Sequence, residues 1–145
     1  VEKTLEAAAR NSGKTVLGLE TSEQQLRFFD QLPHEAQVAY LATTVNELPK
    51  VKKEFATLMR HWLHGDPDKL ATMMNDSIKS TPELAKVLLF DRNARWADWI
   101  AHRLDKPGTV FVAVGAGHLA GKGSVIDLLH GRGLTVRRLS KRDFR

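Results

Sequence analysis

Apolar residues recur with helical spacing over most of the chain. Residues 2–11 fit an amphipathic helix, and a second helix begins at Thr21 or Ser22 and stops at Pro33. Between Pro33 and Asp105 the apolar positions keep a helical period, as expected of several consecutive helices. Within this stretch Gly65 is predicted to end one helix and Pro67 to be the first residue of the next. The pattern therefore predicts a long, purely helical stretch in the middle of the chain.

Three short segments have the composition of strands instead: residues 15–19, 110–114 and 134–139. Short apolar runs of this kind are typical of buried strands in parallel sheets. The order of elements predicts an α/β fold, with a small, mostly parallel sheet and a large helical insertion at about residues 33–105. Because two or three strands make a poor sheet alone, we expect residues 1–145 to be the C-terminal portion of a single, incomplete domain.

The segment 110–114 runs into a glycine-rich turn that carries a histidine, and a helix starts at Ser124. In open α/β sheets, ligands bind at such turns. Gly115 and Gly117 are therefore candidates for contacts with a cofactor or an anion. His118 can ligate a divalent metal, act as a base or hydrogen-bond a turn carbonyl. The turn nearly matches two nucleotide-binding motifs but lacks the acidic residue and the Ser/Thr that they require.

Polar residues at the ends of two other segments are further candidates. Glu20 follows the segment 15–19 and precedes a helix, so it can hold a metal, act as a general base or stabilise the helix N-terminus. Arg92 and Asn93 follow an apolar run, and an arginine there either clamps a carboxylate or phosphate or is a surface charge. The tryptophans have helical spacing and are predicted to be core residues: Trp62, Trp96 and Trp99.

Composition narrows the classes of function. The chain has 145 residues, 42% of them hydrophobic, which is enough for a real core, and no cysteine, which excludes disulfides, thiolate metal ligands and a cysteine nucleophile. No apolar run approaches the length of a membrane span. Much of the net charge of +5 lies near the C-terminus, in Arg137, Arg138, Lys141, Arg142 and Arg145. Only Phe144 is interleaved among them, so a nucleic-acid site is not supported.

Three groups of residues, in this order and spacing, resemble the TraB/GumN family. They are Gly18-Leu19-Glu20-Thr21 with Glu23-Gln24, then Arg92-Asn93, then Val114-Gly115-Ala116-Gly117-His118-Leu119 with Gly121 and Gly123. The resemblance covers nearly the whole chain. It implies a relationship to the Tiki-type metalloproteases and a metal-dependent, hydrolase-like α/β domain.

The resemblance also implies roles for individual residues. His118 matches the second of the family's two Gly-x-x-His motifs and would ligate a divalent cation such as manganese or cobalt. Glu20 would be a ligand or general base, and Arg92 and Asn93 would orient the site, with Arg92 stabilising developing negative charge. The first Gly-x-x-His motif has no counterpart, because no histidine precedes His34. We therefore expect this chain alone to bind metal poorly.

Two functions follow as hypotheses. The first is a metal-dependent, peptidase-like hydrolase in the intact protein, acting on a peptide or a small molecule. The alternative is a non-catalytic binding or regulatory module that uses the glycine turn for an anion or a protein partner, with a homodimer left open. Family members often carry export signals, so the resemblance favours an extracytoplasmic location.

Overall fold

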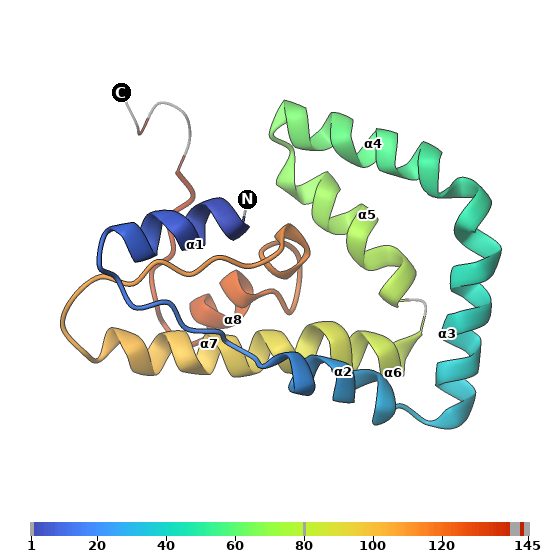
Figure 1. The fold of residues 1–145 in the computed structure, drawn as a ribbon, viewed down its shortest axis with the longest axis horizontal. Coiled ribbons are helices and arrows are strands. Elements are labelled where there is room, and N and C mark those ends of the chain that lie inside the picture. The colour runs from blue at the N-terminus through green and yellow to red at the C-terminus, as the bar shows by residue number, and fades with distance from the viewer. Residues whose placement is uncertain (1, 80, 140–142, 144–145) are drawn as a thin grey trace.

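The computed structural model describes residues 2–79, 81–139 and 143, and the chain within them is dominated by helices (Figure 1). The α-helices are α1 (Glu2–Asn11), α2 (Ser22–Asp30), α3 (His34–Glu47), α4 (Val51–His64), α5 (Pro67–Lys79), α6 (Pro82–Ala85), α7 (Asp91–Leu104) and α8 (Val125–Gly131). Between them lie two 3-10 turns, η1 (Leu48–Lys50) and η3 (Ala116–His118), and a π-helix, η2 (Lys86–Phe90). Four residues of the basic C-terminal segment lie outside the described residues: Lys141, Arg142, Phe144 and Arg145.

Local signals set the helix ends, and those predicted at Thr21, Gly65 and Pro67 are confirmed. Helix α2, which was predicted to stop at Pro33, ends at Asp30 instead. At the start of α2 the Thr21 hydroxyl accepts from the Gln24 N–H at 3.1 Å, and the Gln24 side chain accepts from the Thr21 N–H at 2.8 Å. Gly65 ends α4 with a φ of 67°, a left-handed conformation that glycine adopts without strain. Pro67 then begins α5, where its missing N–H costs nothing.

The predicted α/β fold is wrong: among the described residues there are helices but no strand, and hence no parallel sheet. Segments 15–19, 110–114 and 134–139 run as irregular chain along the helices (Figure 1). Leu19, Val114 and Val136 pack against the cluster formed by α7 and α8, whereas Leu17 and Phe111 are 76% and 77% exposed. The apolar residues of these segments therefore face helices on one side, without the hydrogen-bonded neighbour that a strand needs.

The best-packed part of the molecule is built around α7. Trp96 and Ala97 of α7 pack against Val125 and Leu129 of α8, and all four are buried. Leu84 in α6 is almost completely enclosed. Hence α7 is the element to which the N-terminal chain, the glycine turn and the C-terminal chain are all attached.

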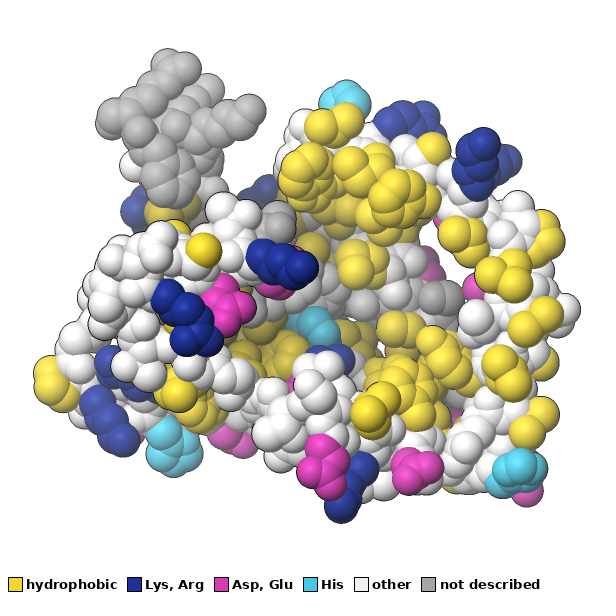
Figure 2. Space-filling model, viewed as in Figure 1, with side chains coloured by type: hydrophobic (Ala, Val, Ile, Leu, Met, Phe, Trp, Pro, Cys, Tyr) yellow, Lys and Arg dark blue, Asp and Glu magenta, His cyan; other side chains and the backbone are white. Residues whose placement is uncertain are grey.

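Helices α3 and α4 form an arm with few buried residues. Figure 2 shows hydrophobic side chains spread over α3, α4 and α5, and Leu41, Phe55 and Leu63 are among those more than half exposed. Of the three predicted core tryptophans only Trp96 is buried; Trp62 is 57% and Trp99 39% exposed. No helix in the described part of the chain has the length and apolar character needed to cross a membrane.

Candidate functional site

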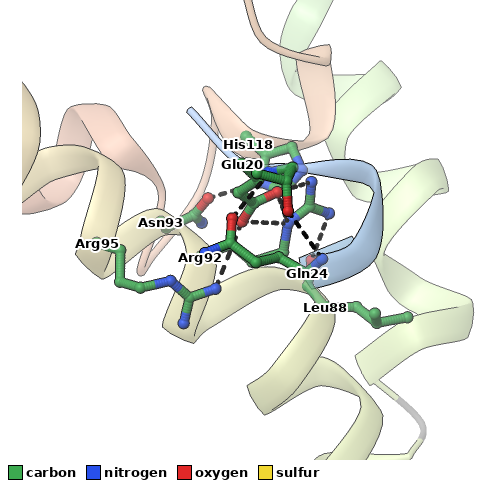
Figure 3. Close-up of polar contacts among 8 residues, drawn as sticks. Glu20, Gln24, Leu88, Arg92, Asn93, Arg95 and His118 are labelled. Carbon is green, nitrogen blue, oxygen red and sulfur yellow. Dashed lines mark hydrogen bonds and ion pairs between the residues drawn. The ribbon is translucent and has the colours of Figure 1, made fainter. Parts of the chain in front are cut away.

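The first turn of α7 holds a buried ion pair. Arg92 donates from Nε to both carboxylate oxygens of Glu20, at 3.1 and 3.0 Å, and from Nη2 to Oε2 at 2.9 Å. The Glu20 side chain is only 4% exposed. Arg95, one turn further along α7, adds a longer contact of 3.4 Å to Oε1. Glu20 is thus a carboxylate held by one forked arginine and one peripheral arginine (Figure 3).

Aromatic rings enclose the cationic side of this pair. The Arg92 guanidinium carbon lies 4.8 Å from the centre of the Trp96 ring system and 5.5 Å from that of Phe28. Both distances are within the range of a cation–π interaction, which strengthens as water is excluded. Both Glu20 oxygens already accept from Arg92, so opening this fork would free the carboxylate further to act as a base or ligand.

His118 lies beside the ion pair and is oriented by Asn93. The Asn93 amide nitrogen donates to the Gly123 carbonyl at 2.7 Å, and its oxygen Oδ1 is 2.7 Å from His118 Nδ1. A carbonyl can only accept, so the first bond fixes the orientation of the amide, and Oδ1 must accept from Nδ1–H. The imidazole therefore carries its proton on Nδ1 and presents the Nε2 lone pair, which has no hydrogen-bond partner among the described residues.

The environment keeps His118 neutral at pH 7. Burial lowers the pKa of His118 to about 4, helped by the positive charge of Arg92 and opposed by the negative charge of Glu20. The Trp96 ring contributes to this burial, with its centre 4.6 Å from the imidazole centre. A neutral imidazole with a free Nε2 is the form that binds a metal or accepts a proton.

A second asparagine holds the glycine turn from the other side. Asn75 of α5 is 4% exposed, and its amide nitrogen donates to the Gly117 carbonyl at 2.8 Å. A Cβ on Gly117 would lie 2.9 Å from Asn75 Oδ1, so this approach requires glycine. Gly115 is exposed, and a Cβ there would meet only the His118 ring at 3.8 Å. Of the two glycines expected to bind a cofactor, Gly117 is thus explained by its close contact with Asn75, without any cofactor.

Sequence reasoning missed Asn75 and the ring contacts of Trp96. The signal for Asn75 was present, because it lies four residues after Ala71 on the buried face of α5. A polar residue at such a position needs a hydrogen-bond partner. The identity of that partner, 42 residues further along the chain, could not be deduced from spacing.

The donor set fits a metal only in part. His118 is a neutral imidazole with a free Nε2, as a metal ligand must be. Asn93 orients the ring by accepting from Nδ1–H, as residues behind metal-binding histidines often do. Glu20 is the nearby carboxylate, but it is paired with Arg92 and Arg95. Within the described residues there is no group of three or more His, Cys, Asp and Glu side chains that could hold a metal. The described residues thus bring together fewer than the three His, Cys, Asp or Glu ligands usual in a catalytic zinc-type site.

The fold and the site define a helical domain that presents a neutral histidine beside a buried glutamate–arginine pair. The family model of the TraB/PrgY/gumN family matches residues 1–138, so the chain belongs to this family, as its motifs predicted. It is similar to protein YbaP of Escherichia coli strain K12 and to YbaP of Shigella flexneri, each 30% identical over 129 residues and named as uncharacterised. These matches cover 89% of this chain but 47% of each relative, so the chain spans about half their length. No solved structure matches the chain.

Proposed function

We propose that this site belongs to a metal-dependent, peptidase-like hydrolase in the whole protein, with His118 as a metal ligand. The observation that carries the proposal is the bond from His118 Nδ1–H to Asn93, which leaves Nε2 of a neutral imidazole available. A divalent cation such as manganese or cobalt, when bound, would supply Lewis acidity and lower the pKa of water. Further ligands would come from outside the described residues.

The other residues have roles that their contacts support. Asn93 fixes the tautomer and plane of the imidazole. Glu20 is a second ligand or a general base once its fork with Arg92 opens, and the freed guanidinium can then stabilise negative charge on a substrate oxygen. The substrate is proposed to be a peptide.

A second function, a non-catalytic binding module, is favoured by a different observation. Both Glu20 oxygens are engaged by arginines, and the described residues lack a three-ligand group. An anion at the glycine turn is the less favoured ligand of such a module, because the Gly123 N–H already donates to the Asp127 carboxylate at 2.8 Å and the Asp127 N–H to Ser124 Oγ at 3.1 Å. A protein partner is the better candidate.

The test compares the full-length protein with two histidine variants. Manganese and cobalt are titrated calorimetrically, and cleavage of a peptide library is followed by mass spectrometry. We expect His118→Ala to lose metal binding and metal-dependent cleavage, and His64→Ala, at the exposed end of α4, to retain both. Full metal-dependent activity in His118→Ala would overturn the proposal. Absence of metal binding by the folded wild-type protein would favour the binding module.

A further inference from the structure

A small pocket adjoins the ion pair, with Glu20 in its lining. Its volume is about 270 Å³, and the residues that matter for its chemistry are Glu20, Gln24, Phe28, Arg95, Trp96 and Trp99. We call it the aromatic pocket. It shares Glu20 and Trp96 with the candidate site, and Trp96 is in ring contact with His118. Glu20 and the Trp96 ring therefore connect the pocket to the candidate site, although His118 itself does not line it.

The charge around the aromatic pocket favours an anion. Glu20 contributes one negative charge and Arg92 and Arg95 two positive charges, so the balance of these three side chains is +1. A cationic ligand would also lie close to the positive charge of Arg95, whose guanidinium carbon is 5.3 Å from the centre of the Phe28 ring. An anion meets neither obstacle.

Arg95 is the group that can receive the anion. Its side chain is 51% exposed, and its contact with Glu20 is a single one of 3.4 Å, in contrast to the short fork made by Arg92. Donor groups of its guanidinium therefore remain available at the mouth of the pocket. Such a planar fork suits a carboxylate, to which it can donate two parallel hydrogen bonds.

The walls and the size of the aromatic pocket define the rest of the ligand. Phe28, Trp96 and Trp99 supply apolar surface, and Trp99 is still 39% exposed and so able to cover a ligand. A volume of about 270 Å³ lies just below the range of sites for drug-sized molecules, and suits a single large side chain. The ligand is thus small, apolar and acidic.

We propose that the aromatic pocket binds the C-terminal residue of a peptide, with its carboxylate on Arg95 and an apolar side chain against Phe28, Trp96 and Trp99. This inference rests on the proposed function for the choice of a peptide over other acids. Binding itself needs neither metal nor catalysis, so it can be measured on the metal-free full-length protein.

The experiment is a titration of the ¹⁵N-labelled full-length protein, without metal, followed by NMR. The indole N–H of Trp96 is the reporter, because it is buried and makes no hydrogen bond within the described residues, together with the indole N–H of Trp99. N-acetyl-phenylalanine is compared with its C-terminal amide, with 3-phenylpropanoate, which lacks the peptide group, and with 2-phenylethylamine, which is cationic. Each is titrated into the wild type, Arg95→Gln and the matched control Arg60→Gln, an exposed arginine on α4.

We expect N-acetyl-phenylalanine to shift both indole signals and to bind at least about tenfold more tightly than the amide, because a charge-assisted pair is lost with the carboxylate. Arg95→Gln should bind N-acetyl-phenylalanine more weakly by the same factor, and Arg60→Gln should bind it as the wild type does. Equal binding of acid and amide, preference for the amine, or unchanged binding in Arg95→Gln would overturn the carboxylate site. Equal binding of 3-phenylpropanoate would overturn the assignment to a peptide. Failure here leaves metal binding by His118 untouched, and failure of the metal titration leaves this site untouched.

Discussion

The α7–α8 core and the α3–α4 arm are both amphipathic helical structures, but they differ in what covers their apolar faces. Trp96 and Ala97 of α7 are buried against α8 and the irregular segments. On the arm, Val38 and Leu41 remain more than half exposed, and the apolar stripe continues into α4 in the same state. The hydrophobic pattern therefore shows which face of a helix seeks a partner but does not show that a partner is present.

The difference extends to the polar residues. Asn93 on α7 is almost fully buried and makes two hydrogen bonds at 2.7 Å, one of them to His118. Asn46 on α3 is exposed. A buried polar group must be paired, and its partners are then held in place, which is why the candidate site is found in the core and not on the arm.

The largest expected effect is the loss of the central ring. Trp96→Ala should lower the free energy of unfolding by about 3–5 kcal/mol, because a buried ring is replaced by a cavity. Phe55→Ala on the arm, where the ring is mostly exposed, should change it by less than about 0.5 kcal/mol. Urea denaturation followed by circular dichroism measures both. Similar losses in the two variants would break the comparison.

The asparagines provide the next test. Asn93→Ala should lower the free energy of unfolding by about 2–3 kcal/mol, because the Gly123 carbonyl and His118 Nδ1–H lose their partner. Asn46→Ala, an exposed position on α3, is the control and should be nearly neutral. Urea denaturation measures both variants. An unchanged free energy of unfolding in Asn93→Ala would mean that the two hydrogen bonds of Asn93 do not stabilise the fold.

A smaller effect concerns pH. In the folded protein the pKa of His118 is about 4, below the ordinary value of 6.5, so the unfolded chain takes up a proton first as the pH falls. Stability should therefore be complete above pH 6.5 and should decline between 6.5 and about 4. Denaturation midpoints across this range are compared between the wild type and His118→Gln, and their difference gives the contribution of His118 to the loss of stability. A decline of equal slope in the variant would show that other groups cause it.

The smallest effect is expected on the arm itself. Leu41→Ser at low protein concentration should change the free energy of unfolding by less than about 0.5 kcal/mol, because the side chain is mostly exposed. If two copies cover each other's arms, the wild type should sediment as a dimer at high concentration and Leu41→Ser as a monomer. A clear loss of stability in monomeric Leu41→Ser would contradict the description of the arm as uncovered.

The features that could be predicted from the sequence are those set by neighbouring residues. The capping box of Thr21 and Gln24 and the left-handed Gly65 depend on neighbours within a few residues, so they could be predicted. A strand depends on a partner elsewhere in the chain. The apolar run at 110–114 therefore gave no means of telling a strand from irregular chain laid on helices.

The residues of the candidate site could be predicted from the sequence, but the hydrogen bonds between them could not. The family resemblance singled out Glu20, Arg92, Asn93 and His118, and the structure brings all four together (Figure 3). That Arg92 occupies both oxygens of Glu20, across 72 residues of chain, follows from the tertiary arrangement alone. The same holds for the bond between Asn75 and Gly117.

The bond between Asn75 and Gly117 places different structural constraints on two parts of the central helical stretch. Helix α5 contributes Asn75 to the turn that carries His118, so its position cannot drift without disturbing that turn. Helices α3 and α4 have no buried residue within the described part of the chain, although α4 packs against α5. We expect relatives of this chain to differ more in the sequence of α3 and α4 than in that of α5, which has to stay in register with the turn.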